Sequence, residues 1–154
     1  MKEILIAPQI DKFETFAEFA AEFKLDENDL IITNEYIYNP IMANAGVKCK
    51  TIFQEKFGGG EPTDVMIDGI LAEMNKYDVK RIIAVGGGTI IDIAKVMCLE
   101  DATETDALYD RAELKKAKEL FIIPTTCGTG SEVTAISVIN RTKRGTKMGL
   151  TSPS

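Results

Sequence analysis

The chain of 154 residues is long enough for one domain with a hydrophobic core, and 45% hydrophobic and 27% charged residues are ordinary for a soluble globular protein. A net charge of -6 without a basic stripe argues against a nucleic acid partner; neither a membrane span nor a signal peptide is recognisable. With no histidine, a self-contained metalloenzyme or Cys/His hydrolase is disfavoured, and the three cysteines, which lack metal-ligand spacing, are expected to be reduced thiols in a cytoplasmic protein.

The first half of the chain predicts alternating strands and helices. Three short apolar runs predict buried strands: Glu3–Ala7, Leu30–Thr33 and Thr51–Phe53. Thr15 begins a helix with Glu18 as its capping-box partner, and Thr63 begins a second helix whose apolar residues share one face. We expect a short helix over Ile41–Ala45 and a loop over Phe57–Pro62. This alternation favours a layered α/β domain.

The stretch KRIIAVGGGTIIDIAKVMC, residues 80–98, combines a strand, a glycine turn and the start of a helix. Ile82–Val85 predicts the strand, Gly86, Gly87 and Gly88 the turn, and Thr89–Val96 the helix. Thr89 is expected to cap this helix, with Asp92 in the reciprocal position. Free N–H groups and the positive end of the helix dipole then face whatever lies above the turn, and glycines allow close approach of the backbone. This order of elements indicates a phosphate site.

An alternative is a glycine-rich turn that binds nothing, as in many α/β domains. The spacing matches neither the G-x-G-x-x-G fingerprint nor the P-loop. The glycine turn alone therefore leaves both interpretations open.

The second half adds a further strand and a hairpin. Thr105–Lys118 is helix-prone and strongly charged, and is expected to be a solvated connector before a buried strand at Leu120–Ile123 that ends at Pro124. Thr134–Ile139 and Lys147–Thr151 predict two strands joined by a turn at 141–145. The fold class is thus α/β, a Rossmann-like parallel sheet flanked by helices, with a C-terminal β-hairpin. Ligands of such sheets bind beyond the carboxyl ends of the strands, where Asn34, the Gly86 turn and the Pro124 loop fall.

The loop Pro124–Thr134, PTTCGTGSEVT, is rich in hydroxyl groups and glycine. The hydroxyls of Thr125, Thr126, Thr129 and Ser131 could bind ribose or phosphate oxygens. Equally, the loop could satisfy only its own backbone. Cys127 is expected to be a packing residue rather than a nucleophile, because no histidine can activate it.

Together, GGGTIIDIAK and PTTCGTGSEVT resemble the two nucleotide-binding motifs of the metal-dependent, iron-containing (group III) alcohol dehydrogenases. FQEKFGGGEPTD is similar to the 4-hydroxybutyrate dehydrogenase branch. The resemblance covers essentially the whole chain but less than half of the usual family length. It implies that residues 1–154 form a dinucleotide-binding domain, and that the helical metal-binding domain of the family is absent from this sequence.

The resemblance also implies roles for residues in this numbering. Gly87, Gly88, Thr89 and Asp92 match the pyrophosphate and adenosine-side motif that starts at Gly86. Thr125, Thr126 and Thr129 match the loop that holds phosphate and nicotinamide ribose, and Val138 and Lys147 match positions beside that ribose; Lys147 could equally be a solvated hairpin lysine. Asn34 stands where many relatives have an Asp that accepts from the ribose 2′-OH, and Glu35, the next residue, is a candidate for the missing carboxylate. The expected cofactor is NAD, with NADP as the alternative.

In the family, one Asp and three His of the C-terminal domain bind the catalytic Fe²⁺ or Zn²⁺, and none of these positions exists here. The resemblance therefore implies an enzyme that interconverts 4-hydroxybutyrate and succinate semialdehyde when full-length and lacks turnover as this fragment. Without the second domain, a surface that normally packs on it would be exposed, so we expect a homo-oligomer or limited solubility. Two alternatives remain: a nucleotide-binding module without chemistry, or a relative of glycerol dehydrogenase or dehydroquinate synthase.

Overall fold

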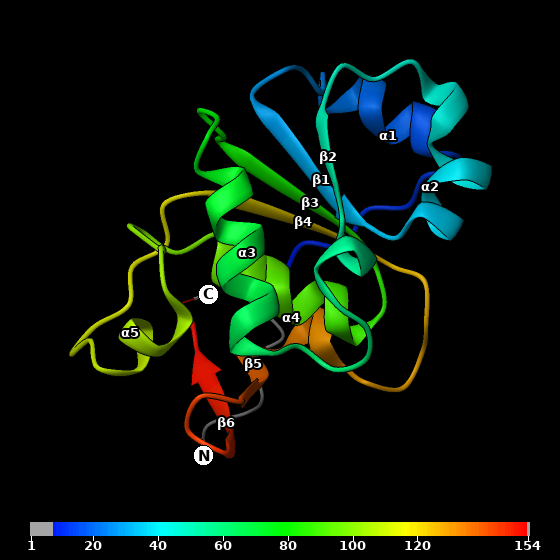
Figure 1. Ribbon diagram of the computed structural model, residues 1–154. Coiled ribbons are helices and arrows are strands. Elements are labelled where there is room, and N and C mark those ends of the chain that lie inside the picture. The colour runs from blue at the N-terminus through cyan, green and yellow to red at the C-terminus, as the bar shows by residue number, and fades with distance from the viewer. Residues whose placement is uncertain (1–7, 154) are drawn as a thin grey trace, which may run out of the picture.

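A computed structural model, which describes residues 8–153, shows a parallel sheet with helices on both faces and a hairpin packed beside one helical layer (Figure 1). The sheet has four strands in the order β2-β1-β3-β4. Their bounds are β1 Asp29–Thr33, β2 Lys50–Phe53, β3 Arg81–Gly86 and β4 Glu119–Pro124. The Rossmann-like prediction is confirmed for this region, whereas the predicted strand Glu3–Ala7 lies outside the described residues.

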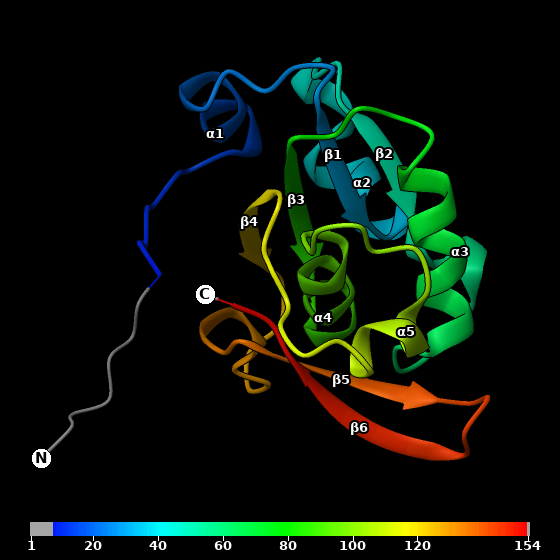
Figure 2. The ribbon, with the colours of Figure 1, turned by 90° about the vertical axis from the view of Figure 1, so that its left-hand side faces the viewer.

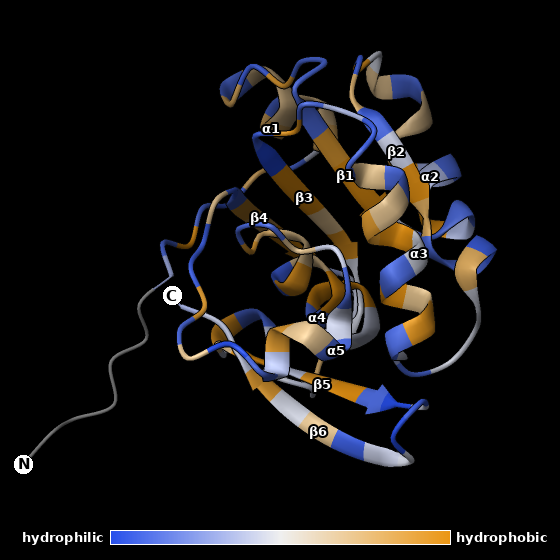
Figure 3. Ribbon diagram, turned by 60° about the vertical axis from the view of Figure 1, so that its left-hand side comes forward, coloured by the Kyte–Doolittle hydropathy of each residue, from blue (hydrophilic) through white to orange (hydrophobic). Residues whose placement is uncertain are grey.

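The central strands bury both faces, as expected when helices cover a parallel sheet on each side. Leu30, Ile32 and Ile82 are completely buried against α3 (Asp64–Met74) and α4 (Gly88–Met97). Ile31 and Ile83 point the other way, toward α1 (Phe16–Glu22) and α2 (Glu35–Ile41). Figure 3 shows the apolar residues concentrated in these strands and on the inner sides of the helices. Each buried side chain of this size contributes about 1.5–3 kcal/mol.

Side-chain caps begin two of the helices where the sequence predicts them. The Thr63 hydroxyl accepts a hydrogen bond of 3.1 Å from Met66 N at the start of α3. The Thr15 hydroxyl accepts from Glu18 N at 3.2 Å, but the Glu18 carboxylate accepts from Glu14 N, one residue before the position that a capping box requires. The predicted helix starts are thus confirmed, with a shifted partner in α1.

Two predictions of local structure are wrong. The helix expected over Ile41–Ala45 is instead α2, Glu35–Ile41, followed by a 3₁₀ turn at Ala43–Ala45. Although proline disfavours a helix interior, α2 accommodates Pro40 one residue before its end.

The stretch from Thr105 is helical at its beginning, as its helix-prone sequence predicts, but it is not solvated there. It forms α5, Thr105–Tyr109, in which Thr105 and Asp106 are buried. The Asp106 carboxylate pairs with the Arg141 guanidinium at 2.7 Å, and Thr105 N and Oγ1 each donate to Asp68 at 2.7 Å. Buried charges need partners, and these come from elements whose proximity the local sequence does not reveal.

The hairpin, β5 Ile136–Arg141 and β6 Thr146–Thr151, runs beneath α4 and α5, as Figure 2 shows. Buried Asp64, at the start of α3, holds its turn by accepting from the N–H groups of Thr142 and Lys143, both at 3.1 Å, and from the Thr142 hydroxyl. The antiparallel hairpin prediction is therefore confirmed, and one carboxylate joins it to the helical layer.

Candidate functional site

The glycine turn connects β3 to α4 as predicted, but Thr89 does not cap the helix. Gly87 is the N-cap residue, with no side-chain cap bond, and α4 starts at Gly88. The Thr89 hydroxyl instead donates to the carbonyl of Gly60 at 3.3 Å, because the loop 58–62 lies against the turn. The first N–H groups of α4 consequently have no side-chain cap and remain available as donors.

Close packing explains two glycines of the turn. A Cβ at Gly86 would lie 2.6 Å from Ile90 Cγ1, so only glycine lets the first turn of α4 approach the strand this closely. A Cβ at Gly87 would lie 3.0 Å from Thr126 Oγ1, inside the space between the turn and the next loop. The turn is therefore shaped by contacts on both of its sides.

The hydroxyl-rich loop 124–134 contacts the glycine turn, although 38 residues separate Gly86 from Pro124, which are paired across β3 and β4. Thr125 N donates to the Gly86 carbonyl at 3.1 Å. A Cβ on Gly88 would meet Thr129 Cγ2 at 3.1 Å. The structure thus brings together the two motifs that the sequence analysis singled out, and places threonine hydroxyls beside an uncapped helix N-terminus.

Asp92 lies on α4 but is directed toward the hairpin. One of its carboxylate oxygens accepts from Val138 N at 3.1 Å, and the other lies 3.3 Å from Lys95 Nζ. Burial lowers the pKa of Lys95, while the charge of Asp92 opposes that shift. Lys95 Nζ also donates to the Ile136 carbonyl at 2.8 Å. Asp92 and Lys95 therefore attach β5 to α4, and the part of Asp92 in cofactor binding stays a prediction.

Val138 and Lys147 occupy neighbouring strands of the hairpin, with Val138 40% exposed. Lys147 Nζ forms an exposed ion pair of 2.7 Å with Glu61 in the loop that also contacts Thr89. The pair crosses from the hairpin to this glycine-rich loop. Exposed pairs of this kind contribute little stability, so Lys147 can exchange Glu61 for another anion at small cost.

Asn34 directly follows β1, and its side-chain amide is already hydrogen-bonded. Its Nδ2 donates to Gln54 Oε1 at 3.0 Å and to Glu55 Oε2 at 2.9 Å, while Glu35 N donates to Glu55 Oε1 at 2.6 Å. Burial favours a higher pKa for Glu55, but the bonds from Glu35 N and Asn34 outweigh it and lower the pKa. Sequence reasoning missed Glu55; the available signal was its position directly after β2, at the same sheet edge as Asn34.

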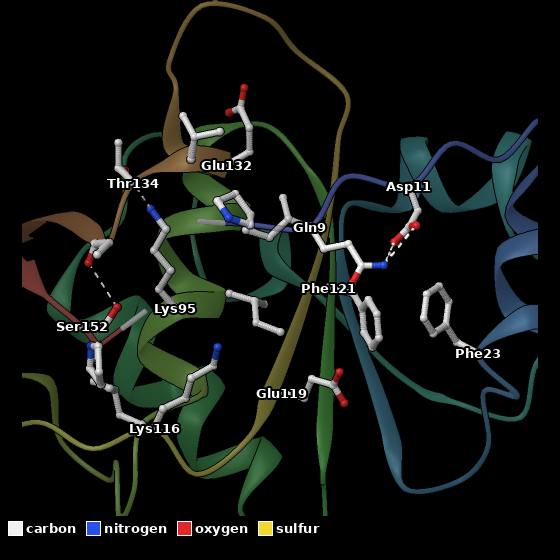
Figure 4. Close-up of a pocket in the computed structure, with 17 residues that line it drawn as sticks. Gln9, Asp11, Phe23, Lys95, Lys116, Glu119, Phe121, Glu132, Thr134 and Ser152 are labelled. Atoms are coloured by element: carbon white, nitrogen blue, oxygen red, sulfur yellow. Dashed lines mark hydrogen bonds between the residues drawn. The ribbon is translucent and has the colours of Figure 1, made fainter. Parts of the chain in front are cut away.

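A separate cavity of about 770 Å³ borders β4, whose outer edge has no partner strand among residues 8–153 (Figure 4). Half-buried apolar side chains such as Phe121 line it, together with Lys95 and Glu132. None of the residues predicted to bind a cofactor lines this cavity. We therefore attribute it to the open sheet edge and locate the candidate site at the glycine turn.

Across residues 8–153, no group of three or more His, Cys, Asp or Glu side chains could hold a metal ion, and the sequence contains no histidine. The described helices include none with the length and apolar character needed to cross a membrane. The residues described here consequently do not fit a catalytic metal.

Comparison with known proteins places this geometry in context. A model of the family "Iron-containing alcohol dehydrogenase" matches residues 9–154. The 4-hydroxybutyrate dehydrogenase of Clostridium kluyveri is 45% identical over 153 residues, which are 99% of this chain but 41% of that protein.

Solved structures share the fold at low sequence identity. An iron-containing alcohol dehydrogenase matches with a TM-score of 0.71 and 22% identity, over 88% of this chain and 40% of that one. Sulfoacetaldehyde reductase from Bifidobacterium kashiwanohense, solved in complex with NAD⁺, matches with a TM-score of 0.70 and 22% identity, over 89% and 38%. The chain thus spans about two fifths of the length of these relatives.

Proposed function

The chain belongs to the iron-containing alcohol dehydrogenase family, and on that premise we propose that residues 1–154 are the domain of a longer enzyme that binds the dinucleotide NAD. The observation that carries this proposal is the contact between the uncapped start of α4 and the hydroxyl-rich loop at Thr126 and Thr129. NAD-bound sulfoacetaldehyde reductase, which shares the fold, supports the choice of ligand.

The glycine turn has the properties that a pyrophosphate requires. The N–H groups of Gly88 and Thr89 start α4 without a side-chain cap, and the helix dipole adds positive potential there. Thr126 and Thr129 add hydroxyl donors from the facing loop. Because a diphosphate is bound here by neutral groups, the site depends on geometry more than on net charge. Lys147 would add a cation at the hairpin side.

Bound NAD supplies a hydride acceptor, and the residues of this chain bind and orient it. For the full-length enzyme we propose the interconversion of 4-hydroxybutyrate and succinate semialdehyde, supported by the 45% identity to the Clostridium kluyveri enzyme. Since the described residues offer no metal site, we propose that the catalytic metal is held by a different part of that enzyme and that this chain alone has no turnover.

Titration calorimetry and thermal unfolding with NAD test the binding step. A ligand at 100 times its Kd stabilises the folded state by about 2.7 kcal/mol, so NAD should raise the melting temperature. Gly87→Ala should weaken binding because its Cβ fills the space 3.0 Å from Thr126 Oγ1. Gly59→Ala is the matched control, since nothing lies within 4 Å of a Cβ there. Equal binding by both variants would contradict the proposed site.

Two assays of NAD reduction with 4-hydroxybutyrate and Fe²⁺ test the rest. We expect none with the 154-residue chain and a measurable rate with a longer protein that contains this sequence. Turnover by the short chain would refute the proposed division of the enzyme. NAD binding together with an inert longer protein would favour a nucleotide-binding module without chemistry.

A further inference from the structure

The carboxylate of Glu55 lies beside Asn34 at the edge of the sheet. Glu55 lies in the 3₁₀ turn Gln54–Phe57 that directly follows β2, and β2 is paired with β1 up to Thr33 and Phe53. This pairing brings Glu55 to the end of β1, where Asn34 stands 21 residues earlier in the chain. The Glu55 carboxylate therefore lies at the edge where a parallel sheet binds its ligands. It follows β2, whereas the family motif places its carboxylate after β1.

The Glu55 carboxylate is negatively charged and exposed. Its two bonds come from neutral donors, the amide of Asn34 at 2.9 Å and the N–H of Glu35 at 2.6 Å. These bonds lower its pKa against the opposing effect of burial, so it is ionised at neutral pH. They also occupy two donors that a second anion would otherwise use. Another anion arriving here meets a fixed negative charge and no free donor from Asn34 Nδ2.

The position of this charge relative to the glycine turn follows from the strand order. β1 is the immediate neighbour of β3, which ends in the turn at Gly86, and β2 lies one strand further out. In dinucleotide-binding sheets, a carboxylate past the end of the strand next to the glycine turn meets the ribose that carries the 2′ group. In this sequence that position holds Asn34, an amide, which by itself carries no charge to repel a phosphate.

We propose that Glu55 supplies the missing carboxylate and determines the preference of this site for NAD over NADP. The inference rests on the proposed NAD-binding function. Glu55 would exclude the 2′-phosphate of NADP by charge repulsion and by keeping the amide of Asn34 engaged, which leaves the uncharged 2′-OH of NAD as the accepted group.

The test compares Kd for NAD and NADP in the intact chain and in three variants that each remove one negative charge. Glu55→Gln should reduce the preference for NAD over NADP by about tenfold or more. The change should come mainly from tighter NADP binding, because the carboxylate that repels the 2′-phosphate is gone. Glu35→Gln removes the charge of Glu35, the alternative carboxylate next to Asn34. Glu27→Gln removes an exposed charge that precedes β1, at the opposite end of the strands. Both should leave the preference within about twofold. Glu35→Gln keeps the Glu55 carboxylate and its bond from Glu35 N, and the charge of Glu27 is exposed, distant from the site and therefore screened.

Each outcome is decisive. An unchanged preference in Glu55→Gln, or a loss of preference in Glu35→Gln instead, would overturn the assignment of Glu55 while leaving NAD binding intact. Failure of the unaltered chain to bind either dinucleotide would overturn the proposed function and this inference with it. Circular dichroism confirms that each variant is folded before its Kd is measured.

A second measurement varies the ionic strength instead of the residue. Raising the ionic strength from about 0.05 to about 0.5 M shortens the screening length severalfold, so it should reduce the NAD preference of the unaltered chain. The same change should have little effect on the preference of Glu55→Gln. A preference of the unaltered chain that does not respond to salt would refute charge repulsion as its cause.

Discussion

Replacing Gly86 by alanine tests how closely the glycine turn packs. Gly86 ends β3, and its backbone does not have a positive φ, so alanine is permitted by conformation alone. The added Cβ, however, would lie 2.6 Å from Ile90 Cγ1 and 2.8 Å from Ile90 Cβ. Carbon atoms prefer separations of about 3.5–4.0 Å. The first turn of α4 must therefore move away from the strand by a large part of this difference.

The expected cost follows from this overlap. Overpacking a well-packed core costs about 1–3 kcal/mol, and Ile90 is only 2% exposed, so its side chain has no free space into which it can turn. A change of 1 kcal/mol lowers the melting temperature of a chain of this size by about 2–4 °C. Because α4 begins at the proposed pyrophosphate site, Gly86→Ala should also weaken NAD binding.

Thermal and urea unfolding followed by circular dichroism, together with NAD titration, measure both effects. Gly59→Ala, whose Cβ would meet nothing within 4 Å, should change neither. Adding Ile90→Ala to Gly86→Ala removes the contact with Cγ1 but keeps the one with Cβ at 2.8 Å, so the two substitutions should cost somewhat less together than the sum of their separate costs. An alanine at position 86 with unchanged stability would refute the packing argument.

Three further predictions concern other contacts. Asp64→Asn should lower stability near neutral pH by about 1.5–3 kcal/mol, the usual value of a hydrogen bond to a charged group. The substitution replaces the carboxylate that accepts from the N–H and the hydroxyl of Thr142 in the hairpin turn. Burial favours a higher pKa for Asp64, but hydrogen bonds, chiefly from the turn, outweigh it and lower the pKa. The stabilisation is therefore complete above the ordinary pKa of 3.8 and is lost as the pH falls further. Urea titrations at several pH values should show the stability difference between Asp64→Asn and the unaltered chain shrinking in acid. Alkylation followed by mass spectrometry should label exposed Cys127 first, more slowly with NAD bound, and should spare Cys98, whose pKa burial raises to about 12; fast labelling of Cys98 would contradict its burial. Asp92→Ala should destabilise the fold by about 3–5 kcal/mol, because it leaves a buried ammonium unpaired, and a melting temperature equal to that of the unaltered chain would argue against the buried pair.

The sequence by itself determined the features whose causes are local. The β-branched run at 82–85, the glycines after it and the cap at Thr63 predict β3, the turn and α3, because each depends on residues within a few positions. The hairpin followed from two alternating runs around a short turn. Family motifs in the same stretches indicated the class of ligand. These signals are local, and the structure confirms the elements that they predict.

Only the tertiary structure decided which partners the polar side chains take. Thr89 bonds the carbonyl of Gly60 29 residues away instead of capping its own helix, and Asp92 bonds Val138 46 residues away. Glu55 reaches Asn34 because β2 pairs with β1. A side chain binds whichever donor or acceptor the folded backbone brings within about 3 Å, and that choice depends on strand order and packing across the whole domain.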